Sequence, residues 1–442
     1  MFKSSGNGFD YYISFQIINN TGGIKTPMNY KHMKLLRYIL RIVSGWPGKQ
    51  LGEKTWKYEE IYGYYNTTLS LTYLAMGITY LKLHIAELTF FELGHLFIVL
   101  MMNILSSSRA STLSISKKYK AVAKQYIGDL HLFFHRAKSE YAKKMHIRVH
   151  RISHYFTIFY SLAMLMALIL FNMTPVYNNY KAGKYESRNL VNTTYEHAIY
   201  LTFPFNTDTN LNGYLIAYVI IWYGSFLCAT SVCSFDMFLS IMVFTLYGHF
   251  KILIHLLESF PIPASIETNK EFKSNNVAGS EFYSISEQKI VKAKLKECIR
   301  YHLVIVDFIN KMSDAFGLAL LIYYVFHQIS GCLLLLECSQ MTAEALARYL
   351  PLTIIMFQQL IQTSIIFESI GAMCEKLKDA VYCLPWEYMD TGNRRTVGIY
   401  FINVQEPIHI SAKGMVNVGV TTMASILKTS FSYFTFLRTV SE

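Results

Sequence analysis

The sequence predicts an all-α membrane protein that crosses the bilayer seven times, with its N-terminus in the cytoplasm and its C-terminus outside. Two observations predict this fold class: long apolar runs that carry few charges, and Lys and Arg residues concentrated in alternate loops. Of the 442 residues, 52% are hydrophobic and only 16% are charged. Soluble domains carry about 25% charged residues, so the composition favours a membrane protein.

The apolar runs are long enough to be membrane spans. A helix needs about 20 apolar residues to cross the hydrocarbon core of a bilayer. Two of the runs carry isolated charges, namely Glu87 and Glu92 in the second and Lys428 in the seventh. The seven predicted spans are Ile61–Leu81, Ala86–Ser106, Ile152–Asn172, Leu211–Phe235, Ala315–Leu336, Tyr349–Phe367 and Gly414–Leu437.

The basic residues predict the orientation of the spans. Of 41 Lys and Arg residues, 34 fall on the side of the N-terminus and six on the other side. Loops rich in Lys and Arg stay in the cytoplasm, so we expect the N-terminus inside. The net charge of +12 then reflects topology and attraction to anionic membrane lipid, and no nucleic-acid partner is expected.

A G-protein-coupled receptor is one alternative, because that class also has seven spans. Its N-terminus lies outside, however, and its helices usually contain internal prolines. Here the nine prolines are expected in loops or termini, apart from Pro351 at the start of a span. The expected outer loop Met173–Asn210 has no cysteine, and no Asp-Arg-Tyr follows the third span. These features disfavour the alternative.

The chain divides into four predicted regions. Residues 1–57 form a cytoplasmic region with an amphipathic helix at Met33–Val43, which is either an interfacial or an ordinary cytoplasmic helix. Residues 58–370 carry the first six spans, 371–412 a cytoplasmic anchor and 413–442 the last helix. Helical patterns over Leu211–Phe250 and Ser286–Met312 are too long for the bilayer alone, so we expect a cytoplasmic helical bundle.

Histidines between the second and third spans raise a second alternative, a metal-dependent membrane enzyme. His131 and His135, and then His146, His150 and His154, recur four residues apart, which places their imidazoles on one helix face. Such enzymes also need His-x-x-His-His elements, which this chain lacks. The neighbouring Lys and Arg residues predict a solvated face instead. We therefore expect no metal, no cofactor and no enzymatic activity.

Five short motifs, spread over nearly the whole chain, resemble those of the insect odorant receptor family. In chain order they are SGWPG (Ser44–Gly48), TFPFNTDTNLNGYLIAY (Thr202–Tyr218), DAVYCLPWEYMD (Asp379–Asp390), QEPIHISAKG (Gln405–Gly414) and SILKTSFSYFTFLR (Ser425–Arg438). Each motif is weakly specific alone. Their order on an inverted seven-span layout makes the resemblance specific.

The resemblance implies a tetrameric, ligand-gated, non-selective cation channel of the plasma membrane, in the dendrites of sensory neurons. Its implied partners are a small volatile odorant, a shared co-receptor subunit in a heterotetramer, membrane lipid, and monovalent and divalent cations. The short loop between spans four and five, Pro261–Ser284, and the Tyr-Phe-Thr-Phe-Leu-Arg ending resemble a ligand-tuning subunit more than the co-receptor.

In this family the last helix lines the pore, and a narrow hydrophobic ring can gate a pore by dewetting. By resemblance the constriction falls at Phe436, a residue larger than the usual aliphatic one, and simple packing is the alternative role. The expected pore residues are Tyr433, Thr435, Phe436, Thr439 and Val440.

The resemblance also implies an odorant pocket in the outer half of the bundle. A small apolar ligand needs aromatic and aliphatic walls with one or two polar groups. Helix–helix packing is the alternative role for each residue taken singly. The expected ligand-binding residues are Phe90, Phe91, Met164, Leu168, Phe171, Tyr214, Tyr218, Trp222, Tyr323, Tyr324 and His327.

Overall fold

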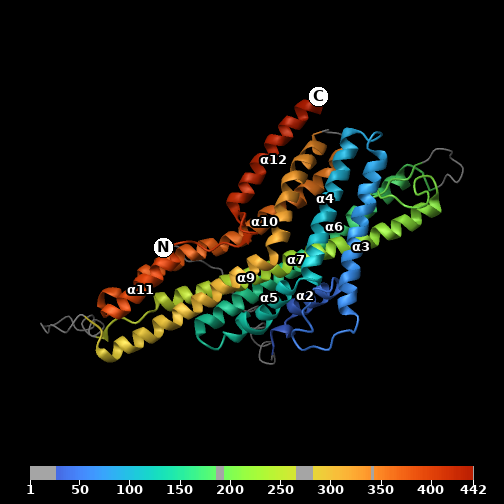
Figure 1. Cartoon of the computed structure of the whole chain (residues 1–442). Coiled ribbons are helices and arrows are strands. Elements are labelled where there is room, and N and C mark those ends of the chain that lie inside the picture. The colour runs from blue at the N-terminus through green and yellow to red at the C-terminus, as the bar shows by residue number, and fades with distance from the viewer. Residues whose placement is uncertain (1–25, 186–193, 265–281, 340–342, 442) are drawn as a thin grey trace, which may run out of the picture.

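The structure is a computed structural model that describes residues 26–185, 194–264, 282–339 and 343–441. Within these residues, a long helix lies at each of the seven predicted spans (Figure 1). They are α3 (Glu59–His84), α4 (Phe90–Ser114), α6 (Glu140–Lys181), α7 (Leu211–Glu258), α9 (Ile285–Cys338), α10 (Ala343–Tyr382) and α12 (Val420–Ser441).

Among the described residues, five of these helices are long and apolar enough to cross a membrane, namely α4, α6, α7, α9 and α10. The chain is therefore a membrane protein with several apolar helices. Helices α3 and α12 are less apolar because Tyr, Thr and Ser recur along them. Their membrane crossing stays a prediction.

Two helices are much longer than a membrane span. Helix α7 has 48 residues and α9 has 54, so at about 1.5 Å per residue each exceeds twice the hydrocarbon thickness of about 30 Å. The side chains of Asn210 and Ser284 cap their N-termini by accepting backbone N–H groups of Asn212 and Glu287. The predicted extensions beyond the spans are confirmed.

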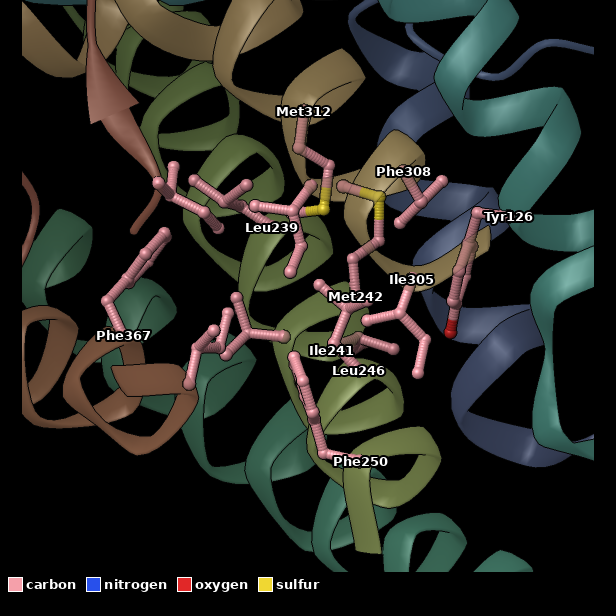
Figure 2. Packing of buried hydrophobic residues seen from close by; sticks show 14 of the residues in the cluster. Tyr126, Leu239, Ile241, Met242, Leu246, Phe250, Ile305, Phe308, Met312 and Phe367 are labelled. Atoms are coloured by element: carbon pink, nitrogen blue, oxygen red, sulfur yellow. The ribbon is translucent and has the colours of Figure 1, made fainter. Parts of the chain in front are cut away.

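The main core lies where α7 and α9 run together, beside residues that follow α5 (Lys117–Gln125). Figure 2 shows Met242 and Leu246 of α7 against Ile305 and Phe308 of α9, with Tyr126 alongside. All five side chains are fully buried. Burial of such an apolar side chain contributes about 1.5–3 kcal/mol, so this region is packed like the core of a soluble protein.

The predicted amphipathic helix is confirmed as α2 (Lys31–Ile42), which follows the short η1 (Pro27–Asn29). Its apolar face, formed by Met33, Leu36 and Leu40, is fully buried against the rest of the protein. Of the two roles left open, the structure supports an ordinary packed helix, since the apolar face of α2 lies inside the protein. The connection from α4 to α6 is also helical, through α5, η2 (Tyr126–Leu130) and η3 (Leu132–Phe134).

The prediction that all prolines except Pro351 fall in loops or termini was wrong for Pro175. Helix α6 continues through this residue to Lys181, and Pro351 also lies inside its helix, because α10 begins at Ala343. Proline removes only one N–H donor, and its fixed φ is compatible with helix. The helix therefore takes the first residues of the expected outer loop Met173–Asn210.

The last helix begins at Val420 instead of Gly414 because a small hairpin precedes it. The chain passes from α10 through η4 (Trp386–Tyr388) and α11 (Thr391–Val404) to strands β1 (Ser411–Ala412) and β2 (Val416–Asn417), which pair antiparallel. Lys413 and Gly414 turn the hairpin with φ of 57° and 69°. A Cβ at Gly317 of α9 would lie 2.8 Å from the Lys413 nitrogen, so the hairpin is seated directly on α9.

Candidate functional site

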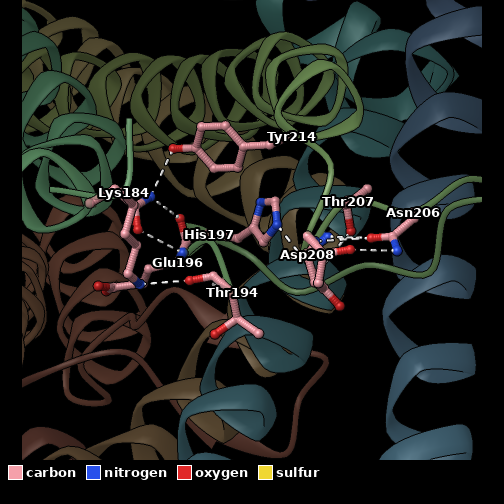
Figure 3. Close-up of polar contacts among 10 residues, drawn as sticks. Lys184, Thr194, Glu196, His197, Asn206, Thr207, Asp208 and Tyr214 are labelled. Carbon is pink, nitrogen blue, oxygen red and sulfur yellow. Dashed lines mark hydrogen bonds and ion pairs between the residues drawn. The ribbon is translucent and has the colours of Figure 1, made fainter. Parts of the chain in front are cut away.

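An aromatic row lies at the outer end of α7. Tyr214 is buried beneath the segment 194–209, with the Tyr195 ring at 4.8 Å and an Nδ2–Oη hydrogen bond of 3.2 Å from Asn179 of α6 (Figure 3). The Tyr218 ring lies 6.2 Å from that of Tyr214, and the Trp222 ring 6.0 Å from that of Tyr218. The structure therefore brings together the three α7 residues expected at a ligand site.

The expected α6 residues lie on a neighbouring surface. Leu168 is buried and Met164 is half-buried. Phe171 packs against the small apolar cluster that includes Ile221 of α7 and Leu201. The side chains of Phe90 and Phe91 at the start of α4 lie outside the described residues.

The expected α9 residues form a second, separate group. Tyr323, Tyr324 and His327 are buried, and the rings of Tyr323 and His327 lie 4.1 Å apart. Tyr323 donates a hydrogen bond of 3.3 Å to Thr363 Oγ1 of α10. The Arg109 guanidinium lies 5.0 Å from the Tyr323 ring, near the inner end of α4. This group is therefore associated with a buried charge.

That charge belongs to an ion pair with Asp236, a residue expected from the sequence to be salt-bridged or hydrated, although its partner Arg109 was not singled out. Arg109 Nη1 lies 2.7 Å from Asp236 Oδ2, and their side chains are only 1% and 6% exposed. Tyr160 donates a 3.0 Å hydrogen bond to the same carboxylate oxygen, and the guanidinium also lies 4.9 Å from the Phe235 ring. The pair joins α4, α6, α7 and, through Tyr323, α9.

Arg109 was counted with the basic residues of the loop between spans two and three, but it lies inside α4. The helical spacing could have indicated that Arg109 is buried. Leu105 and Leu113, four residues away on either side, share its helix face and are buried. Ionisable residues buried inside membrane helices are functional candidates by default because they are costly to keep.

Helix α12 has one packed face and one free face. Ile426 and Ser430 are buried against the bundle, and Thr429 donates a 2.7 Å hydrogen bond to Gln328 of α9. A Cβ at Gly331 would lie 2.9 Å from Ser430 Oγ, so the two helices approach closely there. The exposed residues include four expected in the pore, namely Tyr433 (58%), Thr435, Phe436 (64%) and Thr439. The Val440 side chain lies outside the described residues.

The start of α12 is fixed by α10. Glu368 Oε2 accepts a 2.9 Å hydrogen bond from the backbone N–H of Val420. A carboxylate at a helix N-terminus is favoured by the helix dipole. A Cβ at Gly419 would lie 2.6 Å from the same oxygen, so a side chain at this position would displace the Glu368 carboxylate.

The expectation that the histidines form a solvated face was wrong for His131 and His146, which are buried. Helix α2 and the residue before it cover them: His32 is buried among them, and Tyr30 Oη makes a 2.9 Å hydrogen bond with His146 Nε2. Burial lowers the pKa of His32 and of His131 well below the usual range. Within the described residues, no group of three His, Cys, Asp or Glu side chains is placed to hold a metal ion.

Comparisons with known proteins agree with this architecture. The model of the 7tm odorant receptor family matches residues 119–431. Odorant receptor 85c of Drosophila melanogaster is 21% identical over 288 residues, 64% of this chain and 67% of that protein. Odorant receptor Or2 of Anopheles gambiae is 24% identical over 151 residues, 34% of this chain and 39% of that protein.

A solved structure shows the same fold. The olfactory receptor OR5 of the insect Machilis hrabei, in complex with eugenol, superimposes with a TM-score of 0.71 at 14% sequence identity. The alignment covers 92% of this chain and 97% of that one. A second structure of that receptor gives a TM-score of 0.70 at 13% identity, with coverage of 97% and 99%.

Proposed function

The chain belongs to the insect odorant receptor family, and from this premise we propose that it is the ligand-tuning subunit of an odour-gated, non-selective cation channel. The channel is a heterotetramer with a shared co-receptor in the plasma membrane of sensory-neuron dendrites. The N-terminus is cytoplasmic and the C-terminus is outside, in line with the distribution of Lys and Arg.

The free face of α12 is the observation that carries the proposal. Tyr433 and Phe436 point away from the rest of the chain, whereas Ile426 and Ser430 hold the opposite face against the bundle. A helix held on one side only can line a central pathway when subunits assemble around it. Phe436 then forms the hydrophobic constriction, with Thr435, Thr439 and Val440 beside it.

The aromatic row of α7 is the proposed ligand wall. Tyr214, Tyr218 and Trp222 supply π surfaces, and Phe171 of α6 packs against the cluster that includes Ile221, the residue before Trp222. We assign Leu168 of α6 to the same wall. The buried Tyr218 hydroxyl has no hydrogen-bond partner among the described residues, so it is free to bind a polar atom of an odorant. Phe90, Phe91 and Met164 complete this wall.

The α9 group has a different proposed role. Tyr323 contacts the Arg109 guanidinium, and Gln328, the residue after His327, accepts a hydrogen bond from Thr429 of α12. We assign this group to the inner limit of the ligand site, where occupancy acts on the packing of α9 against α12.

The test is membrane current in cells that express the chain with and without an insect co-receptor, under volatile esters, alcohols, aldehydes and terpenes, with G-protein signalling blocked. A fast cation current that requires the co-receptor is expected. Silence across the panel despite surface expression would contradict the proposed channel function.

Two variants locate the pore and the ligand wall. Phe436→Ala should change ion permeability or block, whereas Phe159→Ala on the exposed surface of α6 should change neither. Tyr218→Phe should raise the half-maximal concentration of alcohols or aldehydes about 2- to 10-fold through loss of one hydrogen bond, and leave permeability unchanged. Unaltered permeability in Phe436→Ala would remove this residue from the pore.

A further inference from the structure

A cavity lies at the C-terminal end of α3, on the other side of the His197 ring from Tyr214, whose ring lies 5.1 Å from that of His197. Its volume is ≈ 370 Å³, and it is bounded by Tyr80 and His84 of α3 and by residues of the segment 194–209. None of the residues assigned above to odorant binding lines it. The cavity is large enough for a small organic ligand.

The segment that forms most of the cavity is held in shape by its own hydrogen bonds. Tyr195 N–H donates to the Asp208 carbonyl at 2.8 Å. Asn206 Oδ1 accepts from the N–H groups of Asp208 and Thr209 at 3.0 Å each, and its amide donates to Thr209 Oγ1 at 2.8 Å (Figure 3). The cavity is therefore built before any ligand arrives.

Aromatic rings form the walls. The rings of Tyr80 and Tyr200 lie 5.7 Å apart at 30°, and His84 stacks on Tyr80 at 4.3 Å. His197 meets Tyr200 edge-on at 6.1 Å. The faces of tyrosine rings attract cations within about 6 Å of their centroids.

The charged group of the cavity is a carboxylate. Asp208 is 60% exposed, and its Oδ1 lies 3.5 Å from Nε2 of His197, which is only 5% exposed. Burial lowers the pKa of His197, so this ring is neutral at pH 7 and leaves the Asp208 charge uncompensated. Among the described residues that line the cavity there is no Lys or Arg. Lys184 lies at the edge of the cavity, where its ammonium donates to the Thr194 carbonyl at 2.6 Å.

A carboxylate beside aromatic faces suits a cation, and within the described chain no triad of metal-ligating side chains surrounds this cavity. We propose that the cavity binds a small organic amine in its protonated form. The ammonium lies between the Asp208 carboxylate on one side and the pair of rings of Tyr80 and Tyr200 on the other. The amine differs in class from the apolar odorant, and its binding is independent of the proposed channel function.

The test is equilibrium binding of radiolabelled phenethylamine to the purified full-length chain in lipid nanodiscs at pH 7.4. Unlabelled 2-phenylethanol, a neutral compound of the same shape, serves as competitor. Phenethylammonium should bind at least about 10-fold more tightly than the alcohol, because only the ammonium makes a charge-assisted contact. Equal binding of the two compounds would overturn the proposal.

Variants place the bound amine. Asp208→Asn should weaken phenethylamine binding about 10-fold or more, whereas Asp208→Glu should retain most of it. Asp307→Asn removes a half-exposed carboxylate from the inner part of α9 and should have no effect. Tyr80→Leu should weaken binding about 2- to 5-fold. Unchanged binding in Asp208→Asn would overturn the site.

Hydrogen exchange separates this site from the proposed odorant wall. Phenethylamine should slow amide exchange in residues 194–209 of the wild-type chain and not in Asp208→Asn. Protection confined to the α7 residues around Tyr218 would show that the amine occupies the odorant wall, and would overturn the proposal. Since no current is recorded in these experiments, a failure here is distinguishable from a failure of the channel function.

Discussion

The most apolar stretches of α7 and α6 are packed in opposite ways. In the most apolar stretch of α7, 83% of residues are buried, whereas in that of α6 the share is 22%. Met242 and Leu246 of α7 have no exposed surface, while Leu162 and Leu170 of α6 are each 57% exposed. Both stretches are apolar enough to cross a membrane, so the difference comes from their neighbours within the protein. Helix α7 is enclosed by α2, α4, α6, α9 and α10, whereas α6 contacts mainly α7 and leaves its other side free. Lipid is as apolar as leucine and does not drive such exposed side chains inward.

Two ion pairs of the molecule also differ in their burial, one between α4 and α7 and the other between α5 and α9. The pairs Arg109–Asp236 and Lys118–Asp314 have the same N–O distance of 2.7 Å. The first pair is almost wholly buried, and the second has side chains that are 65% and 61% exposed. Two ion pairs of equal N–O distance should therefore differ in how much stability is lost when one partner is removed, and mutations can measure this difference.

The largest effect is expected for Asp236→Ala. It leaves the Arg109 guanidinium buried without its carboxylate, and loss of one partner of a buried pair costs about 3–5 kcal/mol. The matched variant Asp314→Ala breaks an exposed pair and should cost at most about 1 kcal/mol. The measurement is thermal unfolding in detergent, and equal shifts for the two variants would contradict the comparison.

The next effect separates the two kinds of packing. Leu246→Ala opens a cavity in the inner core and should lower the free energy of unfolding by about 2–5 kcal/mol. Leu162→Ala makes the same chemical change on the exposed surface of α6, where no cavity forms, and should stay within about 0.5 kcal/mol. The free energies of unfolding of both variants are measured by denaturation in the same lipid. An equally large loss of stability in Leu162→Ala would contradict the difference in packing between the two helices.

The smallest effect is a loss of stability at low pH, which is absent at neutral pH. Burial depresses the pKa of His32 and of His131, so below pH 6.5 the unfolded state binds protons that the folded state does not. Stability of the inner bundle is therefore complete above that pH and is lost as the pH falls. The protection factors for amide exchange in α2, which are corrected for the intrinsic pH dependence of exchange, should fall as the pH is lowered from 7.5 to 5.5.

The control for this effect removes the two buried bases. The double variant His32→Phe with His131→Asn keeps an acceptor for the Phe133 N–H, to which His131 Nδ1 is bonded at 3.1 Å. The neighbouring groups His146, His150, His154, Lys31 and Arg136 stay in place. A pH dependence of α2 exchange identical to wild type would assign the effect to those groups instead.

Much of the helical framework was predictable from the sequence. Helices α2, α7 and α9 were expected close to their observed positions because their apolar periodicity is long and uninterrupted. Pro175 misled the expected end of α6, since proline within a helix and proline at its boundary look alike in sequence. The two-residue strands β1 and β2 could not be predicted from local sequence, because their hairpin is held by its close contact with α9 at Gly317.

The candidate sites were less predictable than the framework. The row Tyr214, Tyr218 and Trp222 was expected because residues four apart share a helix face. Tyr323 was expected in the same pocket, and the sequence did not indicate that its ring would lie 5.0 Å from the Arg109 guanidinium. The cavity beside Asp208 was not expected, since its walls come from α3 and from a segment without regular structure.

By itself, the sequence determined that this chain enters a membrane as long helices, because apolar run length and local periodicity are properties of neighbouring residues. Only the tertiary structure decided which charges and histidines are buried. Arg109 and Asp236 are 127 residues apart, and Tyr30 and His146 are 116 apart. The protonation and energy of such groups depend on partners that the fold brings from distant parts of the chain, and no local pattern contains them.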